Sequence, residues 1–286
     1  MIDPERIAAH VASLPTLPVV VMRLMTLLKD DRSSAHDFEL AVRPDPALTS
    51  NLLRAANSAL YLGMEPCRTV AQAIARVGTR RVFDVAAGGA LQKVIPLRLA
   101  GYQIPSTAFW LHSIAVAVLS ERLARKAKLD CGPHAFTAGL LHDLGKLVIC
   151  EFLADEARAL LASLEERQLT FVVAEHHALG TDHAEVGEEV ARRWRLPEEI
   201  AAVARWHHQP ERAPSHRALV AVVHVANALA HSYGYGTDAG ELHRALCPEA
   251  VARLGLKPSA IEQVVGQSFD DIFTSAEQLG DGTKGV

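Results

Sequence analysis

The chain has 286 residues, of which 49% are hydrophobic and 22% are charged, and its formal net charge is −4. These values are typical of a globular protein with a substantial core, and the slightly acidic balance argues against binding to nucleic acid. No apolar run approaches the roughly 18 residues of a membrane-spanning helix, and the N-terminus lacks a signal-peptide pattern. We therefore expect a cytoplasmic protein with no membrane and no nucleic-acid partner.

Apolar periodicity predicts helices along most of the first hundred residues, and strand-like alternation is almost absent. The expected helices span residues 19–28, 34–42, 45–57, 70–77 and 80–91. Ser34 and Asp45 are the expected N-caps of two of them, and Gly78 is an expected C-cap. Residues 92–107 contain two prolines and a glycine, so they indicate a connection to a second half.

The second half is also predicted to be helical. Its expected helices span residues 108–128, 134–153, 155–167, 172–177, 181–194, 198–207, 219–231 and 258–279. We expect a loop at 234–240 and a frayed end over the last residues, 280–286. The predicted fold is all-α, a multi-helix bundle with an N-terminal helical part (1–100), a helical core (101–240) and a C-terminal extension (241–286).

One segment, residues 138–146, places His142 and Asp143 next to each other in an apolar stretch. A carboxylate is costly to bury alone, and a divalent cation would offset that cost. We expect both side chains to lie on the helix 134–153 and to flank an ion between helices. Lys146 would then lie on the same face as Asp143 and meet an anionic group beside the metal. The alternative is a helix end with an exposed aspartate and a hydrogen-bonded histidine.

Four further histidines lie at or near the ends of other predicted helices: His112, His183, His207 and His208. Each alone is more simply a core or surface residue. Together, in an all-α chain with 14 histidines, they favour a metal site assembled from facing helices. Neutral imidazoles bind transition metals at neutral pH. The set predicts one or two divalent cations, with Asp143 bridging them where there are two.

The pattern resembles the HD superfamily of metal-dependent phosphohydrolases, and more closely its HDOD branch (HD-related output domain). The matching segments are Leu14-Pro-Thr-Leu-Pro18, Asp45-Pro-Ala-Leu-Thr49, Asn57-Ser58, Ala73-Ile74 with Gly78, Trp110-Leu-His-Ser113, residues 138–146, residues 180–187, Trp194-Arg-Leu-Pro197 and His207-His208. The resemblance implies a bacterial, HD-like helical bundle with an N-terminal helical subdomain and a role in signalling. It also implies a metal (Fe, Mn, Ni or Zn) held by His112, His142, Asp143, His183, His207 and His208.

Two departures from the superfamily pattern affect the predicted chemistry. A late helix of the superfamily usually supplies a last aspartate, and here that position is Asn227. Its carbonyl oxygen still offers a weak ligand, but the lost charge should lower the affinity for a cation. In the related HD-GYP group, which hydrolyses cyclic dinucleotides, a Gly-Tyr-Pro signature follows the His-His pair. Here His208 is followed by Gln-Pro-Glu-Arg212, so that specificity does not carry over.

Two functions are compatible with these residues. The first is a regulatory protein whose metal site is structural or ligand-sensing and which acts through protein partners. The alternative is a metal-dependent phosphohydrolase or phosphodiesterase acting on a nucleotide or cyclic nucleotide, with Asp143 and Lys146 as catalytic residues beside an activated water. The residues do not favour turnover over regulation. A nucleotide ligand and a homodimer both stay open.

Overall fold

A computed structural model of the chain describes residues 4–14, 16–58, 65–154, 170–235 and 246–279. The helix expected at 155–167, most of the loop expected at 234–240 and the frayed end at 280–286 lie outside the described residues. The chain forms two compact units by its internal contacts. Unit 1 comprises residues 1–15 and 95–269, and unit 2 comprises residues 16–94 and 270–286. The three consecutive parts expected from the sequence, 1–100, 101–240 and 241–286, have boundaries other than those of the two units.

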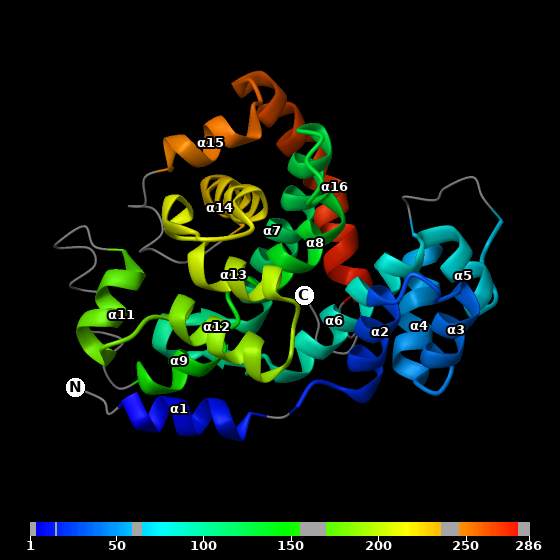
Figure 1. Cartoon of the computed structure of the whole chain (residues 1–286), viewed down its shortest axis with the longest axis horizontal. Helices are drawn as coiled ribbons and strands as arrows, with labels where there is room; N and C mark the ends of the chain where they lie inside the picture. Colours follow the sequence, from blue (N-terminus) through cyan, green and yellow to red (C-terminus); the bar gives the residue numbers. More distant parts are fainter. Residues whose placement is uncertain (1–3, 15, 59–64, 155–169, 236–245, 280–286) are drawn as a thin grey trace. The chain divides into compact units, whose positions relative to one another are not determined.

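Unit 2 is built from helices whose ends follow local capping rules. They are α2 (Val19–Lys29), α3 (Ala35–Val42), α4 (Pro46–Ala56), α5 (Val70–Val77) and α6 (Thr79–Val94), labelled in Figure 1. Ser34 forms a capping box with Asp37, and the Asp45 carboxylate accepts from the backbone N–H of Leu48 at 3.0 Å. Gly78 ends α5 with a positive φ of 84°, a conformation that favours glycine. These three predicted caps are therefore present.

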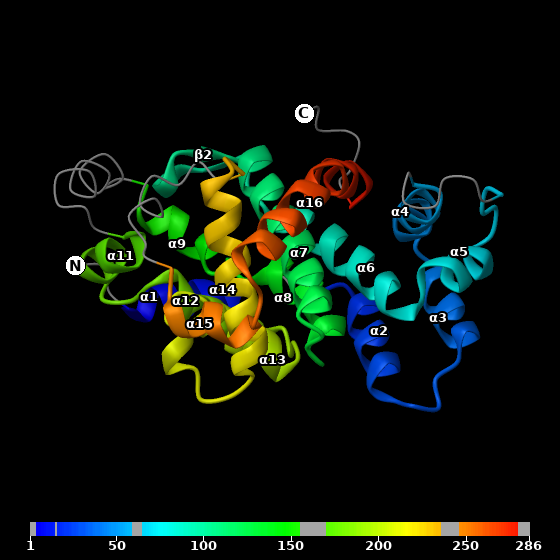
Figure 2. The same ribbon diagram turned by 90° about the horizontal axis from the view of Figure 1, so that it is seen from above.

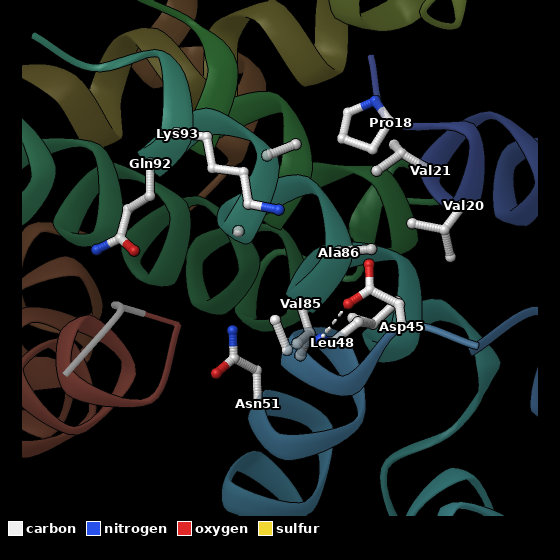
Figure 3. Close-up of a pocket in the computed structure, with 13 residues that line it drawn as sticks. Pro18, Val20, Val21, Asp45, Leu48, Asn51, Val85, Ala86, Gln92 and Lys93 are labelled. Carbon is white, nitrogen blue, oxygen red and sulfur yellow. Dashed lines mark hydrogen bonds between the residues drawn. The ribbon is translucent and has the colours of Figure 1, made fainter. Parts of the chain in front are cut away.

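A small pocket lies where α2, α4 and α6 of unit 2 meet (Figure 3). Its walls are mostly apolar and include Val21, Leu48 and Ala86. Asn51 and Lys93 add polar groups to its lining. None of the predicted metal ligands lines this pocket.

Unit 1 is organised around the long helix α7 (Ser106–Lys126), which packs against α8 (Gly132–Leu141) and α14 (Arg217–Ser232). Figure 2 shows these three helices together in the middle of the unit. The remaining helices of unit 1 are α1 (Pro4–Ser13), α9 (Lys146–Phe152), α11 (Phe171–Leu179), α12 (His183–Arg193), α13 (Glu198–Trp206), η3 (Pro210–Arg212), α15 (Pro248–Leu254) and the first part of α16 (Pro258–Leu279). Helix α12 packs on α13 and α9, and α13 packs on α8. Among the described residues, no helix is both long and apolar enough to cross a membrane.

The expected connection at 92–107 contains a small hairpin. Strands β1 (Arg98–Leu99) and β2 (Ile104–Pro105) pair antiparallel, and the 3₁₀-helix η2 (Ala100–Tyr102) lies between them. A Cβ on Gly101 would lie 2.7 Å from the carbonyl oxygen of Cys150 in α9, so only glycine permits this approach. The hairpin is thereby held against α9.

The single helix expected at 134–153 is wrong, because two helices are separated there by a tight turn. Helix α8 ends at Leu141 and α9 begins at Lys146. Hydrogen bonds across the break are of the tighter i to i−3 type, as from the N–H of Lys146 to the carbonyl of Asp143 at 3.0 Å. A Cβ on Gly145 would overlap the carbonyl oxygen of His183, so the backbone of α12 closely contacts this turn. His142 and Asp143 therefore lie in a turn rather than on a continuous helix.

Candidate metal centre

The predicted histidines converge on Asp143 within unit 1. His112 lies on α7, His183 begins α12, and His207 directly follows α13. Their side chains are buried, and Asp143 itself is only 2% exposed. Packing of α7, α8, α12 and α13 thus brings together side chains that are far apart in the sequence.

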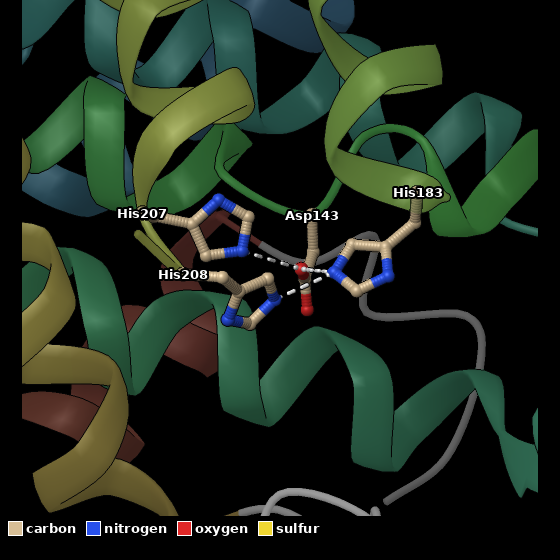
Figure 4. A group of neighbouring side chains, drawn as sticks. All are labelled: Asp143, His183, His207 and His208. Carbon is tan, nitrogen blue, oxygen red and sulfur yellow. Dashed lines mark hydrogen bonds and ion pairs between the residues drawn. The ribbon is translucent and has the colours of Figure 1, made fainter. Parts of the chain in front are cut away.

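The two carboxylate oxygens of Asp143 face different histidines. Oδ1 lies 3.4 Å from Nε2 of His207 and 3.5 Å from Nε2 of His183. Figure 4 shows these groups together with His208, whose Nε2 is 2.7 Å from Nε2 of His183. Oδ2 lies 3.3 Å from Nε2 of His142 and 3.9 Å from Nε2 of His112. Asp143 therefore belongs to two sets of candidate donors, one with His183, His207 and His208 and one with His112 and His142.

In three of these histidines, Nδ1 is engaged with the backbone. The carbonyl partners are those of Tyr235 for His112, Gly139 for His142, and Val203 and Ala204 for His207. A carbonyl only accepts, so each Nδ1 carries the hydrogen and each Nε2 keeps its lone pair. This is the arrangement that metal-binding histidines commonly have, with one nitrogen held by the protein and the other turned to the ion.

The atoms that face the centre fit a divalent cation. Among the described residues, Nε2 of His112, His142 and His207 and Oδ1 of Asp143 are buried without a hydrogen-bond partner. A buried polar atom left unsatisfied costs about 1–3 kcal/mol. A cation bound among these atoms would remove that cost for all of them, and imidazole with carboxylate is a donor set that Zn, Fe, Mn and Ni accept.

The charges are consistent with cation binding at neutral pH. Burial by itself raises the pKa of Asp143, but His142 and Lys146 outweigh it and hold that pKa well below its usual range. Burial lowers the pKa of His112 well below its ordinary value and lowers the pKa of His207 to about 4. At pH 7 the carboxylate is therefore ionised, and these two imidazoles are neutral.

Lys146 lies beside Asp143 at the first position of α9. Its Nζ is 2.9 Å from Oδ2 of Asp143, and the residue is 2% exposed. The ammonium also lies 5.5 Å from the ring centroid of Tyr102. The ammonium therefore balances the negative charge of the Asp143 carboxylate inside unit 1.

Asn227 lies on the face of α14 that is turned toward these residues. Three residues before it, Nδ1 of His224 donates to the carbonyl of His207 at 2.8 Å. Four residues after it, the ring of His231 packs on the ring of His112 with centroids 4.5 Å apart. Residues spaced by three and four share a helix face, so Asn227 points the same way. It is 3% exposed, and its Oδ1 has no hydrogen-bond partner among the described residues.

Glu175 and Tyr102 were not singled out from the sequence, although both contact the cluster. Glu175 on α11 is fully buried and binds His183 through Nδ1 and the backbone N–H. Burial lowers the pKa of His183, but the Glu175 carboxylate outweighs it and the net shift is upward. The available signal was an acidic residue inside the apolar segment 171–179. The neighbouring His176 and His177 are exposed.

Known proteins share both the sequence pattern and the fold. The family model described as HDOD domain matches residues 14–210. An uncharacterized protein of Treponema pallidum (strain Nichols) is 27% identical over 227 residues, which are 77% of this chain and 43% of that protein. The chain thus spans less than half the length of this curated relative.

Two solved structures have the same TM-score of 0.76. One is an HDOD domain protein of unknown function from Geobacter sulfurreducens, 24% identical, covering 97% of this chain and 99% of that chain. The other is a candidate phosphohydrolase from Shewanella amazonensis SB2B, 20% identical, covering 96% and 98%. A candidate signal transduction protein from Marinobacter aquaeolei VT8 is 21% identical with a TM-score of 0.77, covering 97% of this chain and 66% of that chain. With the helical fold, the His/Asp cluster and the match over residues 14–210, the chain belongs to the HDOD domain family.

Proposed function

We propose that this chain is a regulatory HDOD protein that binds a divalent transition metal at Asp143 and its surrounding histidines and acts through contacts with a protein partner. The observation that carries the metal site is the set of buried nitrogen and oxygen atoms around Asp143 that lack a hydrogen bond among the described residues. His112, His142, Asp143, His183, His207 and His208 would hold the metal, and Asn227 would be a weak additional ligand. One or two ions fit the two donor sets that share Asp143.

Burial of the cluster supports a structural or sensing role for the metal. His142, His183 and His207 are 0% exposed. A cation held by such residues would connect α8, α12 and α13 and would stabilise unit 1 in one arrangement. A regulatory role also agrees with the similarity to the candidate signal transduction protein of Marinobacter aquaeolei.

A second candidate function, phosphoester hydrolysis, is favoured by Lys146. A bound divalent cation would supply Lewis-acid chemistry at a phosphoryl oxygen. Lys146 would pair with a phosphate oxygen, and the ionised carboxylate of Asp143 would hold the cation and balance part of its charge. The similarity to the candidate phosphohydrolase of Shewanella amazonensis points the same way. The missing carboxylate at position 227 disfavours turnover, because it removes a negative charge from the donor set.

Metal content tests the proposed site directly. Protein purified without a histidine tag should contain one or two transition ions per chain by elemental mass spectrometry. The His142→Ala variant should lose most of that metal, because it removes a fully buried ligand whose Nε2 faces Asp143 and has no hydrogen bond among the described residues. His36→Ala is the matched control, since the His36 side chain is 69% exposed and pairs with Glu39.

Equal trace metal in the wild type and His142→Ala would show that the cluster is not a metal site. With the site loaded, hydrolysis of bis(p-nitrophenyl) phosphate or cyclic nucleotides in the presence of Mn, Fe or Ni would establish the enzyme. A loaded protein that hydrolyses none of them would support the regulatory function.

A further inference from the structure

Glu175 is a fully buried carboxylate with three hydrogen-bond donors around it. Oε2 accepts from the backbone N–H of His183 at 2.8 Å and lies 2.7 Å from Nδ1 of the same residue. Oε1 accepts from the Tyr102 hydroxyl at 2.6 Å. A buried carboxylate is tolerated only where its oxygens are satisfied, and here both are. Two of the three donors belong to His183, so the contact fixes both the backbone and the ring of that histidine.

This contact determines which nitrogen of His183 faces the cluster. A carboxylate accepts only, so Nδ1 carries the hydrogen and Nε2 is turned toward Asp143 and His208 (Figure 4). Nε2 lies 2.7 Å from Nε2 of His208. Two imidazole lone pairs repel at that distance unless a proton or a cation lies between them. Glu175 thus holds a donor in the orientation that a cation requires.

Tyr102 holds Glu175 in turn, from a different part of unit 1. Its hydroxyl reaches Glu175 from η2, and its ring packs on Phe171 of α11 with centroids 5.2 Å apart. The close approach at Gly101 places η2 against α9, the helix that begins at Lys146. The hairpin therefore contacts both Glu175, which holds His183, and α9, which directly follows the turn that contains Asp143.

We propose that Glu175 is a positioning residue of the metal centre, which fixes His183 with Nε2 toward the ion, and that Tyr102 supports it through its hydroxyl. This inference rests on the proposed metal site. Carboxylates that hold a metal-binding histidine also raise its basicity, and their loss typically lowers metal affinity about 10–100-fold. A merely structural connection between α11 and α12 would change stability without this effect.

The test compares metal affinity with metal-free stability in the full chain. Glu175→Gln keeps the size of the side chain but removes its charge and one acceptor oxygen. Its dissociation constant for Zn²⁺ or Mn²⁺, measured by chelator competition, should rise about 10–100-fold. Tyr102→Phe should cause a smaller rise, because the carboxylate and its contact with His183 remain. Thr181→Ala, which removes a hydrogen bond to Glu185 in the same region, should leave the affinity unchanged.

A second readout is the tautomer of His183, followed by long-range ¹H–¹⁵N spectra of the histidine rings. The wild type should show the Nδ1–H form, and Glu175→Gln should show a mixture of forms. If Glu175→Gln binds metal as tightly as the wild type and keeps the His183 tautomer, the inference about Glu175 is wrong. The proposed metal site would be unaffected by that result. Equal metal content in the wild type and His142→Ala would instead overturn the proposed function itself. If Glu175→Gln fails to fold, the wild type still decides, because an Nε2–H tautomer of its His183 would overturn the inference. Wild-type metal affinity in Tyr102→Phe would overturn the supporting role of Tyr102.

Discussion

Gly145→Ala should destabilise the protein by about 3 kcal/mol or more and remove its bound metal. The added Cβ would overlap the carbonyl oxygen of His183 and lie 2.7 Å from the backbone nitrogen of Gly187. Both are backbone atoms of α12, so no side chain can move aside to make room. Overpacking typically costs about 1–3 kcal/mol, and a backbone clash lies at or above the top of that range. Moving α12 away would also move His183 out of the cluster.

Denaturant unfolding and metal content measure the two effects separately. Gly132→Ala in the same unit is the matched control, because a Cβ there meets nothing within 4 Å. We expect it to change the free energy of unfolding by less than about 1 kcal/mol, in line with ordinary helix propensity. If Gly145→Ala unfolds at the denaturant concentration of the wild type, the close contact between the turn and α12 is wrong.

Local chemistry explains why much of the helical fold could be predicted. Ser34 and Asp45 cap their helices through hydrogen bonds to residues three positions away, and Gly78 adopts a positive φ where its helix ends. Such contacts depend on neighbours in the chain, so the residue types alone indicate them. The apolar periodicity that surrounds them is equally local.

The break between α8 and α9 could not be predicted in this way. Gly145 is the residue of low helix propensity in this turn, but a single glycine is tolerated within a helical pattern, and the apolar pattern continues on both sides of it. The turn packs closely against the backbone of α12, which contacts Gly145 from more than thirty positions further along the chain. The prediction failed because the cause is tertiary packing.

In the candidate site, too, some residues could be predicted from the sequence and others depend on tertiary packing. The resemblance named the histidines that converge on Asp143, because their spacing and sequence order are distinctive. Glu175 escaped notice because its partner Tyr102 is 73 positions away, in a segment expected to be only a connection. Supporting residues such as these have no motif of their own and depend on how α11, η2 and α12 pack.

Asn227→Asp should lower the stability of the metal-free protein and raise its affinity for metal. Without a cation, a new carboxylate at a position that is 3% exposed would be buried on the helix face turned toward Asp143. Burying such a group without a partner costs several kcal/mol, or forces it to bind a proton. A bound cation would compensate the charge, so we expect the dissociation constant to fall at least about 10-fold (about 1.4 kcal/mol). Saturating metal should then raise the melting temperature of the variant by more than it raises that of the wild type.

Asn51→Asp in unit 2 is the matched control. Asn51 is 7% exposed, and its Oδ1 accepts from Arg54, a bond that an aspartate keeps. It should leave metal affinity unchanged, because unit 2 contains none of the predicted ligands. Chelator competition and thermal unfolding with and without metal measure both variants. If Asn227→Asp loses metal-free stability but binds metal no more tightly than the wild type, the side chain at 227 lies out of reach of the ion. The asparagine at 227, in place of the superfamily's aspartate, would then have no effect on the metal affinity of this centre.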